Sequence, residues 1–202
     1  MHPNQVFHTE TEARNLAFAR QRSFGILAVE GPLLAHVPFL ISAEANSIGL
    51  HLVRSNPIAR ALRGGPCAAR IAVSGPDSYV SPDWYEVDDQ VPTWNYVAVH
   101  LWGTLELRPQ EELRGLIEAQ SKFFEEKLAP KPPWTTAKMT PEVLEKMMQQ
   151  IVPCRLQIEG IDGTWKLNQN KPDEVRLRAA DKVAQAELGV DTGTLAAMMR
   201  DT

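Results

Sequence analysis

The stretch Val91-Pro-Thr-Trp-Asn-Tyr-Val-Ala-Val-His-Leu-Trp-Gly103 decides the fold of this chain. From Asn95 to Leu107 aliphatic residues alternate with others, which is typical of a strand with one face in a core. The core face carries Val97, Val99, Leu101, Leu105 and Leu107. The second face carries Tyr96, Ala98, His100, Trp102, Thr104 and Glu106. Because a solvated face normally carries Lys, Glu and Thr, we expect this face to meet a ligand or a partner subunit, with cover by a helix of the same chain as the alternative.

Composition indicates a soluble globular protein. The 202 residues are enough for one larger domain or two small ones, and 44% are hydrophobic and 23% charged. A formal net charge of −4 gives no support for a basic nucleic-acid-binding surface. No apolar run approaches the roughly 18 residues of a membrane span, and residues 1–11 do not have the pattern of a signal peptide. Cys67 and Cys154, which form no CxxC pair, fit buried thiols in the cytoplasm.

Caps and periodicity predict many short strands joined by turns, with helices at the ends. Thr9 and Glu12 have the spacing of a capping box, which predicts a helix over 9–22. Strands are expected at 23–30, 33–41, 47–53, 66–74, 95–107 and 152–161, and helices at 57–62, 109–128, from 140, and in a tail over about 172–202. This order favours a β-barrel or α+β architecture over a parallel doubly wound sheet.

The strongest chemical signal is His51-Leu-Val-Arg54-Ser55-Asn56-Pro57. A strand ends here, and Asn56 and Pro57 take the N-cap and first positions of the next helix. Free backbone N–H groups at a helix start attract anions, and Arg54 and Ser55 add a guanidinium and a hydroxyl. The segment is a candidate phosphate cradle; the alternative is an ordinary helix cap with a solvated Arg54.

Two further segments carry candidate binding groups. Pro38 lies inside a strand, which marks an edge or a bulge with free backbone groups, and a flat heteroaromatic ligand could lie against His36 and Pro38. The alternative is an edge strand with a half-buried His36. Residues 165–171, Trp-Lys-Leu-Asn-Gln-Asn-Lys, gather hydrogen-bond donors just after a strand, with a solvated turn as the alternative.

Several chemistries find no support in the sequence. There is no glycine-rich nucleotide-binding loop of the Rossmann or P-loop kind and no Gly-x-Ser-x-Gly elbow. The five histidines form no His-x-x-x-His pair, so no metal site is expected. No residue has the pattern of a dedicated nucleophile or general base, and catalytic residues stay unassigned.

Four segments resemble the FMN-binding negative transcriptional regulators, the PaiB-like family. They are 75–85 (Gly-Pro-Asp-Ser-Tyr-Val-Ser-Pro-Asp-Trp-Tyr), 91–103, 166–170 (Lys-Leu-Asn-Gln-Asn) and the spacing His51-x-x-Arg54-x-Asn56-Pro57. The resemblance implies a split β-barrel related to the pyridoxamine-phosphate-oxidase-like flavoproteins, with peripheral helices. It further implies a homodimer that holds FMN at the subunit interface.

The resemblance also implies where FMN binds. The implied cofactor contacts are His36, Pro38, His51, Arg54, Ser55, Asn56, Trp94, Tyr96, Lys166 and Gln169. The phosphate would lie at 54–56 and the isoalloxazine near His36 and Pro38, with interface and pocket walls from 94–102. Ser55, Ile58 and Asn168 depart from the family pattern, where a small apolar, an aromatic and a serine residue are usual.

We therefore expect one FMN-binding split-barrel domain over 1–202 that acts as a flavin-dependent regulator. A flavin-dependent oxidoreductase acting on a small molecule is one alternative. A haem-handling protein, with His36, His51 or His100 as ligand, is the other. Direct DNA binding has no support from the charge or from a helix-turn-helix pattern.

Overall fold

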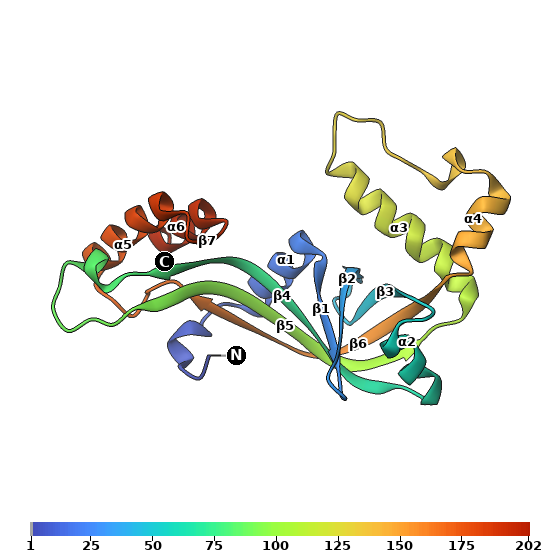
Figure 1. Ribbon diagram of the computed structural model, residues 1–202, viewed down its shortest axis with the longest axis horizontal. Helices are drawn as coiled ribbons and strands as arrows, with labels where there is room; N and C mark the ends of the chain where they lie inside the picture. The colour runs from blue at the N-terminus through green and yellow to red at the C-terminus, as the bar shows by residue number, and fades with distance from the viewer. Residues whose placement is uncertain (1) are drawn as a thin grey trace. The chain divides into compact units, whose positions relative to one another are not determined.

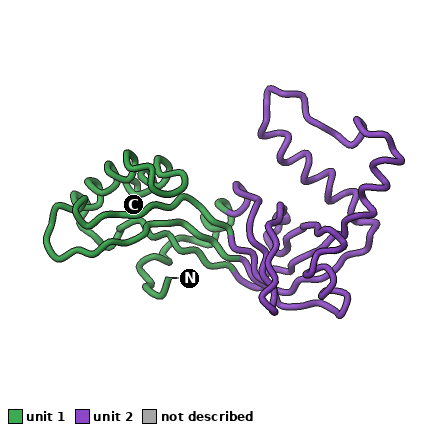
Figure 2. The backbone as a smooth tube through the Cα atoms, viewed as in Figure 1, with its two compact units in different colours: residues 1–18, 73–100, 161–202 green, residues 19–72, 101–160 purple. Residues whose placement is uncertain are grey.

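The computed structural model describes residues 2–202, which form two compact units (Figure 2). Unit 1 contains the residues up to Phe18 together with 73–100 and 161–202, and unit 2 contains 19–72 and 101–160. The strands are β1 Phe24–Val29, β2 Leu33–Ile41, β3 Ser47–Val53, β4 Cys67–Val80, β5 Thr93–Leu107, β6 Ile151–Lys166 and β7 Gly189–Val190. The α-helices are α1 Glu12–Arg22, α2 Pro57–Ala61, α3 Leu113–Glu126, α4 Pro141–Met148, α5 Asp173–Ala186 and α6 Thr192–Arg200. Short 3-10 turns are η1 Gln5–Phe7, η2 Leu62–Gly64, η3 Pro82–Tyr85, η4 Gln110–Glu112 and η5 Thr136–Lys138.

The strands of unit 2 close into a barrel. Their hydrogen-bonded order is β1-β2-β3-β6-β5-β4, and β4 pairs again with β1 from Ile26↔Ala72 to Val29↔Ala69. The β1–β2, β1–β4, β2–β3 and β3–β6 ladders are antiparallel. The predicted fold class, a mainly antiparallel α+β split β-barrel with peripheral helices, is confirmed.

The alternation of β5 predicts its buried face correctly from Val97 to Leu105, whereas Leu107 is only half-buried. Fully buried side chains in the core of unit 2 include Leu27, Phe39, Leu50, Leu101, Leu105 and Leu156. The second face is half-buried at Trp102, whose indole packs on Gly160 and carries the Arg70 guanidinium 5.2 Å from the ring centroid. A Cβ on Gly160 would lie 2.2 Å from this ring. Part of the second face is therefore covered by unit 2 itself.

Four predicted elements have wrong boundaries. The helix expected over 109–128 begins only at Leu113, after the 3-10 turn η4, and ends at Glu126. Helix α1 begins at Glu12, because the Thr11 hydroxyl rather than Thr9 caps it by accepting the Arg14 backbone N–H at 3.2 Å. Strand β4 continues past residue 74 to Val80, and β6 continues past 161 to Lys166. Gly75 lies inside β4, where a Cβ would meet Phe18 and Val97 at less than 3 Å. This glycine therefore allows close packing and does not end the strand.

The helices cover parts of each unit. In unit 1, β7 pairs with β4 at Asp77 and Ser78, and α5 and α6 pack on each other beside it (Figure 1). The predicted tail is thus two helices broken at Gly189.

Cys154 is buried as expected, and burial raises its pKa to about 12, whereas Cys67 is only half-buried, contrary to expectation. Over residues 2–202, no helix has the length and apolar character needed to cross a bilayer. A single domain over the whole chain stays a prediction.

Candidate functional site

The predicted helix cap after β3 is confirmed. Asn56 is extended at φ −60° and ψ 136°, and its Oδ1 accepts the Ile58 backbone N–H at 2.8 Å. Pro57 takes the first helical position, where a missing N–H costs nothing. The Asn56 side chain is thereby committed to α2.

Arg54 is held in place by neutral oxygen atoms. Its Nε donates to the Gln149 carbonyl at 3.0 Å, and its terminal nitrogen donates to Gln110 Oε1 at 3.0 Å and to the Ile151 carbonyl at 3.4 Å. Arg54 is exposed, as the alternative interpretation expected, and its guanidinium is nevertheless anchored by these hydrogen bonds. Since none of these acceptors is a carboxylate, the positive charge of the guanidinium stays uncompensated.

A hollow of about 510 Å³ lies beside Arg54, which we call the arginine hollow. It is lined by Val53, Arg54, Ser55, Arg60, Arg63, Gln149 and Gln150. Within residues 2–202, its three arginines form no ion pair, and its lining contains no carboxylate. Arg60 and Arg63 were missed by sequence reasoning, although their spacing of three residues after a helix start would place them on one face.

A second cavity lies where the β2–β3 ladder stops. The last ladder pair is Phe39↔Leu50, so Pro38 and His51 face each other one step beyond it. Gln120 of α3 bridges them: its Nε2 donates to the Pro38 carbonyl at 3.3 Å, and its Oε1 lies 3.0 Å from His51 Nδ1. The free backbone group expected at Pro38 is thus present, and α3 supplies its partner.

This second cavity, the His51 cavity, has a volume of about 350 Å³. Its lining is Pro38, His51, Ile117, Gln120, Ser121, Phe124, Glu125 and Trp134. Burial lowers the pKa of His51, and the hydrogen bond with Gln120 offsets part of this effect, so the imidazole is neutral at pH 7. Glu125 accepts the Trp134 backbone N–H at 2.8 Å and pairs with Lys131, so its charge is already used.

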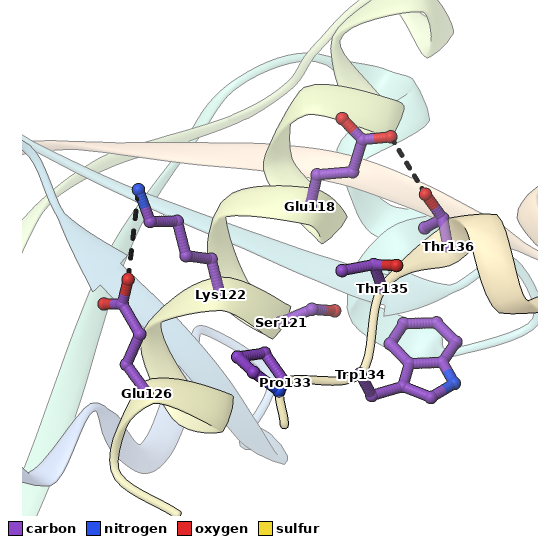
Figure 3. A pocket seen from close by; sticks show the side chains of 8 residues that line it. All are labelled: Glu118, Ser121, Lys122, Glu126, Pro133, Trp134, Thr135 and Thr136. Atoms are coloured by element: carbon purple, nitrogen blue, oxygen red, sulfur yellow. Dashed lines mark hydrogen bonds and ion pairs between the residues drawn. The ribbon is translucent and has the colours of Figure 1, made fainter. Parts of the chain in front are cut away.

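An adjoining cavity of about 360 Å³ shares Ser121 and Trp134 with the His51 cavity (Figure 3). Each of its charged side chains has a partner in the structure. Glu118 accepts the Thr136 hydroxyl at 3.2 Å, and Lys122 lies 3.9 Å from Glu126. We assign this cavity no ligand.

His36 lies on the outer face of the β1–β2 hairpin. It is exposed, not half-buried as the alternative for this strand required, and its ring stacks on Phe24 at a centroid distance of 6.3 Å. Leu34 lies two residues earlier on the same face and is 64% exposed.

The remaining predicted contacts lie in unit 1. Lys166 is the last residue of β6, donates to Thr93 Oγ1 and lies 5.8 Å from the Phe7 ring centroid. Burial, followed by the charge of Lys171, lowers its pKa. Trp94 is 48% exposed and meets Tyr79 edge-on at 6.3 Å, and Tyr96 is half-buried.

The segment 165–171 is not a solvated turn. Trp165, Leu167 and Asn168 are buried. Gln169 accepts the Leu167 backbone N–H at 2.8 Å and donates to the carbonyls of Trp165 at 2.6 Å and Val6 at 3.2 Å. Its amide therefore holds this segment together. Of the predicted contacts, the structure brings Arg54 and Ser55 to one hollow and Pro38 and His51 to one cavity, all in unit 2, whereas Asn56 caps α2 and does not line the hollow.

Comparisons with known proteins concern the family and the fold. A family model described as "Putative FMN-binding domain" matches residues 1–160. The "Protease synthase and sporulation protein PAI 2" of Bacillus subtilis (strain 168) is 26% identical, over 91% of this chain and 89% of its own. The fold is similar to the FAD and Heme binding protein from Mycobacterium smegmatis, with TM-score 0.57 and 17% identity, covering 91% of this chain and 82% of that one. It is also similar to the conserved hypothetical protein Rv2991 from Mycobacterium tuberculosis, with TM-score 0.56 and 15% identity, covering 85% and 94%.

The likeness in structure concerns the fold alone. The family match covers more than half of the chain and includes the arginine hollow and the His51 cavity. The protein belongs to this FMN-binding family, the PaiB-like family that its sequence resembles, with FMN as the cofactor.

Proposed function

We propose that unit 2 binds FMN with the phosphate in the arginine hollow and the isoalloxazine against Pro38 and His51. One observation carries the proposal: three guanidinium groups line a hollow without a carboxylate. A phosphate monoester carries about −1.5 to −2 charges at pH 7, and guanidinium groups match its oxygens in charge and geometry. Ser55 adds a hydroxyl at the same place.

The spacing along β3 supports the same arrangement. His51 lies in β3 and Arg54 directly follows Val53, the last residue of this strand, and an extended chain rises roughly 3.3 Å per residue. The backbones of the two residues are thus at most about 10 Å apart along the strand direction, which is comparable with the extended ribityl phosphate chain of FMN. A dinucleotide needs room for a second nucleotide, and the hollow has a single cluster of cations. We therefore propose FMN in preference to FAD.

The predicted contacts in unit 1 remain part of the proposal on the strength of the family resemblance. Lys166 supports it best, because its half-buried ammonium is paired with a hydroxyl and no carboxylate. Trp94 and Tyr96 offer aromatic faces. Gln169 has the weakest support, since its amide is used within its own unit.

We also propose that the protein is a homodimer. Support comes from apolar side chains on the outer face of the β1–β2 hairpin, where Phe24 is 53% and Leu34 is 64% exposed beside His36. Two such faces related by a two-fold axis would bury each other.

The proposed role is flavin-dependent regulation in the cytoplasm. The two free cysteines support this location, because thiols stay reduced there. A net charge of −4 gives no support for direct DNA binding.

Titration of the flavin-free protein with FMN, riboflavin and FAD tests the phosphate assignment. The unmodified protein should bind FMN most tightly. The double variant Arg60→Ala/Arg63→Ala should lose FMN affinity and keep its riboflavin affinity, because riboflavin lacks the phosphate. Arg114→Ala is the control, since this exposed arginine of α3 lies outside the hollow. Equal losses for FMN and riboflavin, or tighter binding of FAD, would refute the assignment.

A further inference from the structure

The backbone at Pro38 explains why a polar side chain from α3 is buried against the barrel. The Phe39 N–H donates to the Ser23 carbonyl of the β1 side at 3.0 Å, so the Pro38 carbonyl points to the β3 side. The ladder with β3 ends at Phe39↔Leu50, and proline has no N–H to extend it. Without a side chain from another element, the Pro38 carbonyl would have no hydrogen-bond donor. Gln120, which is only 5% exposed, supplies that donor.

This contact determines how the Gln120 amide is oriented. A carbonyl can only accept a hydrogen bond, so the nitrogen of the amide must face Pro38. The amide oxygen then faces His51 Nδ1, and this oxygen can only accept. Nδ1 of His51 must therefore carry the proton. Because burial keeps the imidazole neutral, Nε2 is unprotonated, and it has no hydrogen-bond partner within residues 2–202.

We propose that Gln120 is a positioning residue that holds His51 in its Nδ1–H tautomer, so that Nε2 accepts a hydrogen bond from an N–H group of an uncharged planar ring in the His51 cavity. The apolar lining by Pro38, Ile117, Phe124 and Trp134 suits the faces of such a ring. The one acidic side chain of the lining, Glu125, is held by Lys131 and the Trp134 N–H, so the cavity offers no free charge.

The inference deepens the proposed function and rests on it for the identity of the ring. Oxidised isoalloxazine is uncharged and planar, and N3–H is the one N–H donor on its ring. An unprotonated Nε2 complements that N–H, whereas an Nε2–H tautomer would present a donor to it. By setting the tautomer of His51, Gln120 thus determines which edge of the ring the His51 cavity accepts.

The tautomer is tested first, without any flavin. Nitrogen NMR of histidine-labelled protein distinguishes the two tautomers, and His51→Gln assigns the signals. We expect the Nδ1–H form in the unmodified protein, its loss in Gln120→Leu and its retention in Gln120→Glu, whose carboxylate still accepts from Nδ1. Ser121→Ala is the control, because Ser121 lines the cavity and bonds neither His51 nor Pro38. An Nε2–H form in the unmodified protein, or an unchanged tautomer in Gln120→Leu, would overturn the inference.

The donor is tested with riboflavin and 3-methylriboflavin, which lack the phosphate and so do not depend on the arginine hollow. Methylation at N3 should weaken binding roughly three- to tenfold in the unmodified protein, the scale of one net hydrogen bond, and have little effect in Gln120→Leu. If riboflavin and FMN bind and methylation changes nothing, the inference fails while the proposed function stands. If neither FMN nor riboflavin binds and the tautomer is as expected, the proposed function and the ring fail together, and the role of Gln120 in positioning His51 stands.

Discussion

We propose two separable roles for Arg54, one in the fold and one in ligand binding, and Arg54→Met would remove both. The guanidinium joins the end of β3 to Gln110 and to the segment before β6 through hydrogen bonds to Gln149 and Ile151. These bonds are exposed and go to neutral acceptors, so together they stabilise the fold by about 1 kcal/mol. A charge-assisted contact with phosphate contributes more, about 1.5–3 kcal/mol, which is roughly a 10- to 150-fold change in FMN affinity.

Two assays separate these roles. Urea unfolding without flavin measures the loss of stability, and fluorescence titration with FMN and riboflavin measures the loss of affinity. Arg54→Lys should keep part of the FMN affinity because it keeps the charge and loses the fork of donors. Arg114→Met should change neither quantity appreciably, since Arg114 has long contacts of 3.9 and 3.8 Å with Glu118 and Glu145. The reasoning is refuted if Arg54→Met weakens riboflavin as much as FMN, or leaves FMN affinity unchanged.

Three further predictions follow from packing, titration and exposure. Gly103→Ala should destabilise the barrel by about 3 kcal/mol or more in urea unfolding, because its Cβ would lie 1.8 Å from the Gln157 carbonyl oxygen; Gly115→Ala, with open space around it, should not. Burial lowers the pKa of His51 below the ordinary 6.5, so the unfolded chain binds that proton more readily than the folded one. The free energy of unfolding should therefore fall as the pH falls below about 6.5 toward the folded pKa. His51→Gln should flatten this part of the profile of unfolding free energy against pH, and an identical profile would contradict the sign. Leu34→Asp should convert a dimer into monomers in light scattering, and a monomeric unmodified protein would end the dimer proposal.

Local sequence signals predicted most of the strands and turns. The bounds of β2 and β3 agree with the prediction, because turn residues such as Gly31 and Pro32 and the cap at Asn56 mark the ends within a few residues. The predicted core face of β5 is also buried from Val97 to Leu105, because alternation follows directly from strand geometry. Strands β4 and β6 were predicted too short, because glycines that serve close packing look like strand ends when the partner strand is not known.

The candidate site was predicted only in part. Arg54 and Ser55, which line the arginine hollow, could be predicted because their signal is a short local motif. Gln120 was missed, although it interrupts the apolar series Leu113, Ile117 and Phe124 of α3, and a buried polar residue in such a series needs a partner. The sequence could indicate that Gln120 needs a hydrogen-bond partner, but it could not predict that Pro38 and His51 are the partners.

The sequence by itself determined the alternating pattern of strands, the helix cap after β3 and, through its motifs, the FMN-binding family. The closure of the barrel by β1 and β4, the meeting of Arg60 and Arg63 with Arg54, and the bridge from Pro38 through Gln120 to His51 were decided by the tertiary structure. The physical reason is distance along the chain. A cap or a strand face depends on neighbouring residues, whereas Gln120 lies 82 residues from Pro38 and 69 from His51, and only the packing of α3 against the barrel brings these groups within hydrogen-bond distance.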